Sequence, residues 1–219
     1  MIQLNKLTKS YRTRSGRRYV FRDLDLSIPE GVNVGLIGGN GAGKSTLMRI
    51  LGGIDFPDAG EVVTQKRISW PLALSGGFQG SLSGRENVKF VCRVFGREDE
   101  LEEKVQWIKA FSELGDYFEE PVKSYSSGMK SRLAFAMSMG FEFDVYLVDE
   151  ITAVGDQAFR DKSRQAFHDL RERASIIMVS HDLGTLKAQC DVGVLIEDGN
   201  AFYFDRIDDA IDRYRKGPQ

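Results

Sequence analysis

The 219-residue sequence has little of several residue types that build particular kinds of site. It contains two cysteines, two histidines and five prolines. Cys92 and Cys190 lie far apart and lack metal-ligand spacing, which indicates free, mostly buried thiols in a reducing compartment. A formal net charge of −2 gives no electrostatic signal for a nucleic-acid partner. Composition therefore offers no support for a cysteine metal centre, a disulfide framework or a nucleic-acid surface.

Long apolar runs are also missing. No stretch approaches the roughly 18 residues that a membrane-spanning helix needs. The first residues, Met1–Lys6, lack the basic start, apolar centre and cleavage site of a signal peptide. We therefore expect a protein of the cytosol, or one bound to something that itself lies in a membrane. A hydrophobic content of 42% is enough to build a substantial core.

The most informative stretch is glycine-rich and lies between an apolar run, 32–37, and a helix-prone segment, 46–51. It matches the phosphate-loop pattern G-x-x-x-x-G-K-[ST], whose glycines let several backbone N–H groups face one anion at the positive end of a helix. Lys44 would supply a full charge to the outer phosphates, and Ser45 a hydroxyl to Mg²⁺. The pattern favours nucleoside triphosphate binding over a turn that binds nothing. The predicted nucleotide contacts are Gly38, Gly39, Asn40, Gly41, Ala42, Gly43, Lys44, Ser45 and Thr46.

Hydrophobic periodicity predicts an α/β protein. We expect a P-loop NTPase core, with a mixed sheet and flanking helices, plus an N-terminal antiparallel β region and an inserted helical lobe. The predicted strands are 2–11, 19–28, 61–63, 145–148, 175–180 and a hairpin over 192–204, with a basic turn at 12–18. The predicted helices are 87–95, 98–114, 127–140, 157–173 and 206–216. The whole chain is expected to be one domain, with 1–84 and 144–219 as the nucleotide-binding core and 85–143 as the lobe.

An acid pair follows the predicted strand at 145–148. An apolar strand that ends in Asp149 downstream of a phosphate loop resembles a Walker B element, whose aspartate positions Mg²⁺. The alternative is a buried strand whose end carries two solvated acids, Asp149 and Glu150. The presence of the phosphate loop in the same chain favours the first interpretation.

The order and spacing of these motifs resemble the ATP-binding subunit of ABC transporters. In that family two copies pair head to tail, and ATP lies between the phosphate loop of one copy and the signature motif of the other. The signature position here is YSSGM, which departs from L-S-G-G-Q at Tyr125, Ser127 and Met129. Ser126 and Gly128 remain, and the resemblance implies that they meet the γ-phosphate. The alternative is an ordinary Ser-capped helix.

The same resemblance assigns roles to five further residues. Glu150 matches the general base that orients the attacking water, and His181 the switch histidine at the γ-phosphate. Asp156 matches the acid of the D-loop, within 153–156. Tyr11 matches the aromatic that stacks on adenine, although a core tyrosine at a strand end is the alternative. Gln79 is our choice as the glutamine that contacts Mg²⁺ and water, but it stands only seven positions before Glu86.

Four stretches narrow the resemblance to the ATPases of bacterial capsular polysaccharide exporters. They are 11–31, 69–90, 124–150 and 153–156, and the likeness covers nearly the whole chain. It implies ATP and Mg²⁺ as cofactors and a homodimer in the ATP-bound state. It also implies an integral membrane permease as partner, a polysaccharide handled by the complex, and a peripheral location at the cytoplasmic face of the bacterial inner membrane.

Three other functions stay open from the sequence. An exporter of O-antigen or teichoic acid would share the same motifs, although O-antigen exporters often carry an extra carbohydrate-binding domain, so the end of this chain near the ATPase core favours the capsule branch. A soluble ABC-type ATPase that acts on DNA or ribosomes usually has a coiled-coil insertion or two fused ATPase units, and neither is present. A small P-loop kinase is disfavoured by the pair Asp149 and Glu150, because a kinase must avoid activating water.

Overall fold

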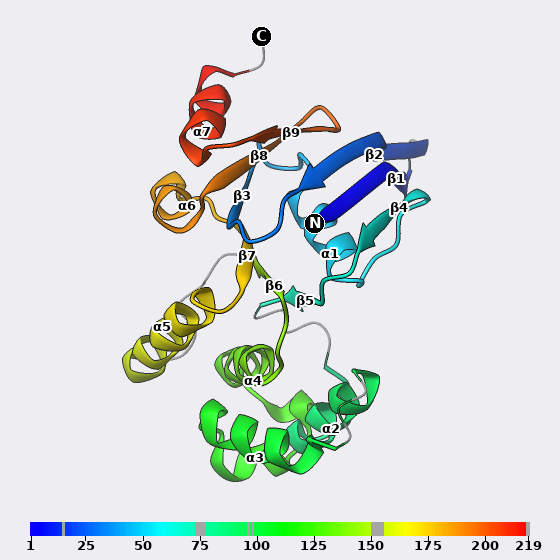
Figure 1. Cartoon of the computed structure of the whole chain (residues 1–219). Coiled ribbons are helices and arrows are strands. Elements are labelled where there is room, and N and C mark those ends of the chain that lie inside the picture. Colours follow the sequence, from blue (N-terminus) through cyan, green and yellow to red (C-terminus); the bar gives the residue numbers. More distant parts are fainter. Residues whose placement is uncertain (15, 73–77, 96, 98, 150–155, 218–219) are drawn as a thin grey trace. The chain divides into compact units, whose positions relative to one another are not determined.

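The computed structural model describes residues 1–14, 16–72, 78–95, 97, 99–149 and 156–217. The chain forms two compact units, whose elements can be followed in Figure 1. The first unit comprises Met1–Pro71, Phe143–Glu150 and Arg173–Gln219, and the second comprises Leu72–Glu142 and Ile151–Glu172.

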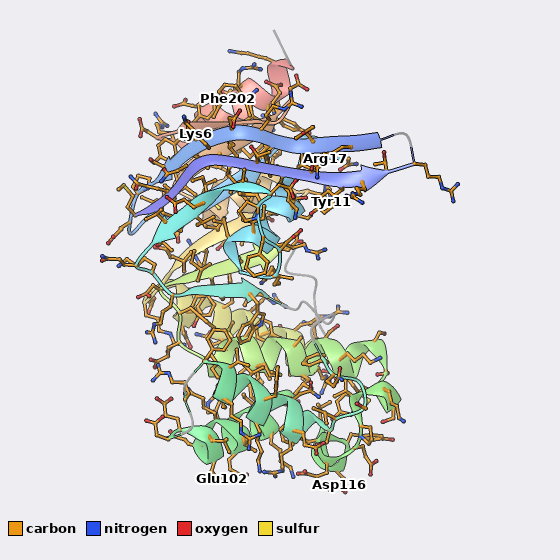
Figure 2. All side chains as sticks on the ribbon, turned by 90° about the vertical axis from the view of Figure 1, so that its right-hand side faces the viewer. Lys6, Tyr11, Arg17, Glu102, Asp116 and Phe202 are labelled. Carbon is orange, nitrogen blue, oxygen red and sulfur yellow. The ribbon has the colours of Figure 1, made fainter. Side chains whose placement is uncertain are left out.

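The first unit begins with a three-stranded antiparallel sheet in the order β2-β1-β4. Its strands are β1 (Ile2–Thr13), β2 (Gly16–Ile28) and β4 (Ala59–Thr64). The antiparallel N-terminal region is thus confirmed, but the predicted basic turn over 12–18 is wrong. Arg12 pairs with Arg17 inside the ladder, and the strands resume at Gly16, so Arg17 lies on the extended hairpin, where Figure 2 labels it. Arginine suits an exposed strand because its stem lies along the sheet while its charged end stays in water.

The second sheet of this unit is six-stranded and mixed, in the order β5-β6-β7-β3-β8-β9. All neighbours are parallel except the β8–β9 hairpin. This confirms the predicted α/β core with a mixed sheet. The strands are β3 (Val34–Ile37), β5 (Ile68–Pro71), β6 (Val145–Asp149), β7 (Ser175–Val179), β8 (Val192–Glu197) and β9 (Asn200–Phe204). Strand β5, which has four residues and ends in proline, was not predicted from the sequence.

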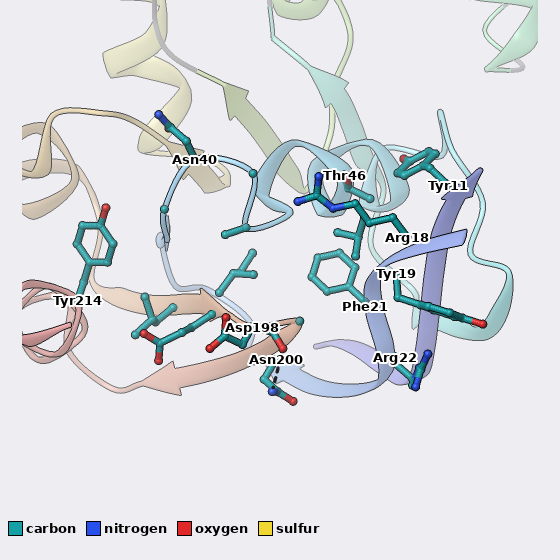
Figure 3. A pocket seen from close by; sticks show the side chains of 18 of the residues that line it. Tyr11, Arg18, Tyr19, Phe21, Arg22, Asn40, Thr46, Asp198, Asn200 and Tyr214 are labelled. Atoms are coloured by element: carbon teal, nitrogen blue, oxygen red, sulfur yellow. Dashed lines mark hydrogen bonds between the residues drawn. The ribbon is translucent and has the colours of Figure 1, made fainter. Parts of the chain in front are cut away.

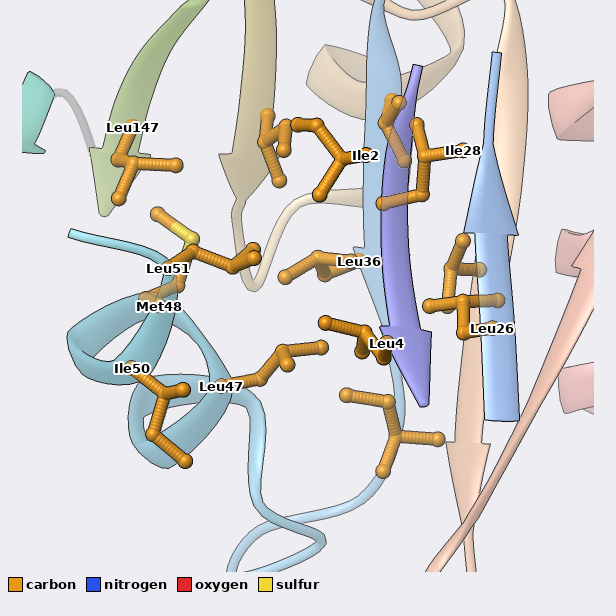
Figure 4. Packing of buried hydrophobic residues seen from close by; sticks show 14 of the residues in the cluster. Ile2, Leu4, Leu26, Ile28, Leu36, Leu47, Met48, Ile50, Leu51 and Leu147 are labelled. Atoms are coloured by element: carbon orange, nitrogen blue, oxygen red, sulfur yellow. The ribbon is translucent and has the colours of Figure 1, made fainter. Parts of the chain in front are cut away.

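The described residues of the first unit include the helices α1 (Lys44–Leu51), α6 (Leu183–Gln189) and α7 (Ile207–Lys216). The buried face of α1 packs with side chains from both sheets into one hydrophobic core, as Figure 4 shows for Leu47 of α1, Leu4 of β1 and Leu36 of β3. This packing fixes the start of α1, and with it the loop that precedes it, against the sheet. Helix α6 was not predicted from the sequence. Asp182 caps it by accepting hydrogen bonds from the N–H groups of Gly184 and Thr185.

The second unit is helical. It contains α2 (Gly84–Val94), α3 (Leu101–Ser112), α4 (Ser127–Gly140), α5 (Gln157–Arg171) and two short 3₁₀ helices, η2 (Gly115–Glu119) and η3 (Val122–Ser124). Helix α5 packs here because Phe159 meets Phe111 of α3 and Phe135 of α4, with ring centres 6.0 and 6.4 Å apart. The helical character of the region is as predicted, whereas the domain boundaries given above stay a prediction.

Candidate active site

The glycine-rich loop connects β3 to α1 and leaves the first amides of the helix facing out of its N-terminus. Gly43 caps α1 in a left-handed conformation, with φ of 113°. A Cβ atom there would lie 2.7 Å from side-chain atoms of both Val20 and Phe21. At Gly38, a Cβ atom would lie 2.5 Å from the Ile196 carbonyl oxygen. Both positions therefore require glycine, and the loop holds the shape that an anion-binding turn needs.

Lys44 is held over this loop. Its ammonium donates hydrogen bonds to the carbonyl oxygens of Gly38, at 2.6 Å, and of Gly39, at 2.9 Å. Partial burial lowers the pKa of Lys44, and the charge of Asp149 acts against that shift. Asp149 thus lies close enough to influence the lysine electrostatically. This places the Walker B candidate beside the loop, within one compact unit.

Strand order explains why these groups meet. In the parallel part of the mixed sheet, β7 lies between β3 and β6. Val179 pairs with Leu36 on one side and with Asp149 on the other. Since parallel strands end at the same edge, the loop after β3, Asp149 at the end of β6 and His181 after β7 all lie at that edge. His181 is exposed.

The donors at this edge fit a magnesium ion. Ser45 has an exposed hydroxyl in the first turn of α1, and Asp149 offers a half-buried carboxylate. Among the described residues there is no cluster of three or more His, Cys, Asp or Glu side chains suited to hold a metal alone. Mg²⁺ commonly binds through one or two carboxylates plus substrate phosphates. A magnesium site formed by Ser45, Asp149 and phosphate oxygens matches that coordination preference.

A cavity of about 1050 Å³ opens beside the loop. Figure 3 shows its lining, which comes from the loop, the outer part of the β1–β2 hairpin and the β8–β9 hairpin. Tyr11 lines the cavity and is 40% exposed, so it is not a core tyrosine. Its ring and the phosphate loop are separate parts of one pocket, which suits a ligand with a flat base at one end and phosphates at the other.

Two residues that the sequence analysis missed hold Tyr11 in place. The tyrosine hydroxyl donates to Asp55 over 2.7 Å, and the Lys9 ammonium lies 5.1 Å from the ring centre. Lys9 is only 7% exposed and forms an ion pair with Asp55 at 2.6 Å. The one signal in the sequence was the lysine two positions before the aromatic, on the same face of a strand. Its acidic partner lies 46 positions away and could not be identified without the fold.

The signature-like residues lie in the second unit, at the start of α4. Ser126 caps this helix by accepting a hydrogen bond from the Met129 N–H at 3.2 Å. Gly128 is exposed, and a Cβ atom there would meet nothing nearer than the Ser126 hydroxyl, at 3.9 Å. Tyr125, which stands where the family motif has leucine, fits its local surroundings. Its ring is buried, and its hydroxyl would lie 2.7 Å from a Cβ atom at position 84, which is glycine. The helix start presents free amides, as a phosphate-contacting segment must.

Asp156, the D-loop acid, lies in the same unit and caps α5 by accepting from the Phe159 N–H at 3.0 Å. It also accepts from the Arg132 guanidinium of α4 at 2.7 Å. The backbone hydrogen bond from Phe159 and then the charge of Arg132 lower the pKa of Asp156. Arg132 lies 4.7 Å from the centre of the Phe159 ring and 3.6 Å from Glu113. One arginine, missed in the sequence analysis, thus joins the helix of the signature segment to the start of α5.

We expect Arg132→Ala to lower the free energy of unfolding by about 1–2 kcal/mol, because the variant loses a mostly buried stem packed on an aromatic ring. Urea unfolding followed by circular dichroism measures this change. Arg164→Ala is the matched control: it removes an exposed ion pair to Asp161, which is worth well under about 1 kcal/mol. Equal effects of the two variants would show that Arg132 does not link these helices.

Gln79, the glutamine-loop candidate, is exposed, and its backbone is held by a buried side chain. The Asn87 amide accepts from the Gln79 N–H at 2.9 Å and donates to the Gln79 carbonyl oxygen at 3.2 Å. Asn87 is 3% exposed and also donates to the Ser83 carbonyl oxygen, at 2.9 Å. These hydrogen bonds fix the backbone at Gln79. The contact of the Gln79 side chain with Mg²⁺ and water stays a prediction. Glu150 and residues 153–155 of the D-loop lie outside the described residues.

Comparison with known proteins identifies the family. The family model described as "ABC transporter" matches residues 21–153, more than half of the sequence. The chain belongs to the ABC transporter family. Within the described part of this ABC family member, no helix is both long and apolar enough to cross a membrane.

Relatives of this ABC family member match it along its whole length. It is 55% identical over 217 residues to the polysialic acid transport ATP-binding protein KpsT of Escherichia coli, with 99% of each chain covered. It is 45% identical to the capsule polysaccharide export ATP-binding protein CtrD of Neisseria meningitidis, with full coverage of both. A solved ATP-binding cassette, a dimer bound to ADP and Pi, matches with a TM-score of 0.73 at 21% identity, covering 94% of this chain and 99% of the other. That structural likeness confirms the fold.

Proposed function

We propose that this chain is the ATP-hydrolysing subunit of an exporter of capsular polysaccharide. The observation that carries the proposal is the 55% identity to a polysialic acid transport ATP-binding protein across 99% of both chains. The site geometry supports the same function, because an intact phosphate loop, Lys44 and Asp149 are neighbours in one unit. ATP is the proposed substrate, and the pumping work would be done with a separate membrane permease as partner.

The residues of the first unit divide the binding of ATP between them. Loop amides and the α1 N-terminus would hold the phosphates, with the Lys44 ammonium moving from the loop carbonyls to phosphate oxygens. Tyr11 would stack on adenine, oriented by Asp55. Ser45 and Asp149 would hold Mg²⁺, which neutralises charge on the transferred phosphoryl group. Gln79 belongs to the second unit, and its contact with Mg²⁺ and water stays a prediction. His181, at the same sheet edge, would contact the γ-phosphate.

Hydrolysis needs two more groups. We assign Glu150 as the base that orients water and accepts its proton. The second group is the signature segment of another copy, since Ser126 and Gly128 start a helix whose free amides suit the γ-phosphate. A homodimer in the ATP-bound state would thus complete two composite sites, with Asp156 near the pairing surface. Such a subunit would lie at the cytoplasmic face of the inner membrane, bound to its permease.

Glu150→Gln is expected to retain ATP binding but to hydrolyse it about 10²–10⁴-fold more slowly, because removal of a general base typically costs that much. The variant should collect as an ATP-bound dimer, which gel filtration with and without ATP would show. Glu142→Gln, an acid eight positions earlier in the sequence, is the control. Normal hydrolysis by Glu150→Gln would place the base elsewhere, and lost ATP binding would make the residue structural.

The transport proposal is tested in cells and the enzymatic part in solution. An Escherichia coli strain that lacks its polysialic acid transport ATP-binding protein should regain surface polysaccharide when it expresses this chain, but not when it expresses Lys44→Ala. Purified protein should release phosphate from ATP with no acceptor present, which a kinase would not do. The contradicting outcome requires that the chain is expressed and hydrolyses ATP. If it then restores O-antigen export but not capsule export in matched strains, the capsule assignment is wrong.

A further inference from the structure

Five exposed arginines lie on the outer part of the β1–β2 hairpin: Arg12, Arg14, Arg17, Arg18 and Arg22. The register of β1 and β2 distinguishes Arg18 from Arg17, its neighbour in the sequence. Arg18 is the cross-strand partner of Tyr11, whereas Arg17 is the partner of Arg12. Directly opposed residues share a face of the sheet, and successive residues point to opposite faces. Arg18 therefore shares a face with the proposed adenine-stacking tyrosine, and Arg17 lies on the other face.

This placement brings Arg18 to the nucleotide cavity. Arg18 lines the cavity together with Tyr11, residues 39–42 of the phosphate loop, and Thr46 in the first turn of α1. In Figure 3 the Arg18 side chain extends from the hairpin toward Thr46. Arg17 is not among the described residues that line the cavity. Its charge instead helps to lower the pKa of Asp58, after the larger effect of hydrogen bonds from Ser10.

Two other charged groups of the cavity, Arg22 and Glu197, already have partners. The Arg22 guanidinium lies 4.0 Å from the centre of the Tyr19 ring, and Glu197 forms an ion pair with Arg213 at 3.0 Å. Asp198 lies at the tip of the β8–β9 hairpin, away from Arg18 in Figure 3. The Arg18 side chain makes no hydrogen bond or ion pair with any residue that the structure describes, whereas its backbone pairs with Tyr11 in the β1–β2 ladder. It is an uncommitted cation in a pocket that already contains an anion-binding loop.

We propose that Arg18 binds the phosphate chain of the nucleotide, as a second cation beside Lys44. The inference rests on the proposed nucleotide site. Tyr11 offers the flat surface for the base, and Arg18 points past it to the start of α1, where phosphates meet free amides. The guanidinium fork donates two parallel hydrogen bonds to phosphate oxygens, a geometry that lysine cannot reproduce. Arg18 is thus a binding residue that sets affinity for the nucleotide.

The test compares ATP binding by isothermal calorimetry in EDTA, which prevents hydrolysis, at fixed ionic strength. Arg18→Ala should raise the Kd for ATP by about tenfold or more, as expected for a charge-assisted hydrogen bond. Arg17→Ala removes the same charge from the opposite face and should change Kd by less than about twofold. Arg18→Lys should fall between wild type and Arg18→Ala. The factor lost in Arg18→Ala should be the same for ATP, GTP and CTP.

Three results would overturn the proposal. If Arg17→Ala and Arg18→Ala change the Kd for ATP equally, the role of Arg18 is no more than a general effect of charge. A loss confined to ATP would place Arg18 on the adenine base instead of the phosphates. Failure of the wild-type protein to bind ATP would overturn the nucleotide site itself, and is recognised before any variant is compared. Arg18→Gln, which keeps much of the side chain without its charge, gives the same comparison if alanine perturbs the exposed strand.

Discussion

Lys44→Ala should abolish ATP hydrolysis and weaken ATP binding. The lysine is the fixed positive charge of the loop, and its ammonium is held at 2.6 Å and 2.9 Å from the two loop carbonyl oxygens beside the phosphate position. A preorganised charge aimed at the transferred group typically accounts for about 10²–10³ in rate. We therefore expect phosphate release to fall at least about a hundredfold, as followed by a continuous phosphate assay with purified protein.

Lys66→Ala is the matched control for this experiment. Lys66 belongs to the same unit, and its ammonium pairs with the exposed Glu30 at 3.2 Å, so its loss should leave turnover within about twofold. Unfolding midpoints of both variants without nucleotide separate a folding defect from a binding defect. Unchanged hydrolysis by a folded Lys44→Ala protein would refute the phosphate-loop assignment.

Gly128→Asp should block hydrolysis by a different route, while the single chain still folds and binds ATP. The structure has room for the new side chain, because a Cβ atom at position 128 meets only the Ser126 hydroxyl, at 3.9 Å. An acid in the first turn of a helix is also compatible with the helix dipole. In an ATP-bound dimer, however, the carboxylate would face the γ-phosphate of the ATP held by the other copy, and like charges repel strongly when desolvated.

The measurements for this variant are ATP affinity, gel filtration with ATP, and phosphate release. We expect near-normal affinity, no ATP-dependent dimer and at least about a hundredfold loss of turnover. Gly128→Ala, which adds a methyl group without charge, should lose much less. If Gly128→Asp forms the dimer and turns over normally, the signature segment has no role at the γ-phosphate.

The sequence was enough to predict the parts of the fold that rest on local pattern. The strand, glycine-rich turn and helix around Gly43 follow from residue types whose backbone preferences are strong. The buried strands β6 and β7 are short apolar runs, and α4 was predicted with its observed ends because Ser126 is a good N-cap. Membership of the ABC family followed from the order of these motifs.

The parts that could not be predicted depend on contacts distant in sequence. Strand β5 has only four residues and ends in proline, which is too short a pattern to predict a strand, and it pairs with β6 as a parallel partner. Residues 12–18 were predicted to form a turn, because nothing in the local sequence indicates that Arg12 pairs with Arg17 across two strands. The Lys9–Asp55 pair and the Arg132–Asp156 pair join residues 46 and 24 positions apart. The last two contacts orient predicted site residues, Tyr11 through Asp55 and Asp156 through Arg132, and all four require the tertiary fold.

The central claim is that two copies of this chain build two composite sites from Lys44 of one copy and Gly128 of the other. Mixing Lys44→Ala with Gly128→Asp tests it most directly. In the mixed dimer both defects fall in one site, and the second site keeps a normal Lys44 and a normal Gly128. The mixed dimer, isolated through two affinity tags, should then release phosphate at about half the wild-type rate per dimer, because one of its two sites is intact, although each variant alone is inactive. No recovery in a mixed dimer verified by two affinity tags would contradict the account.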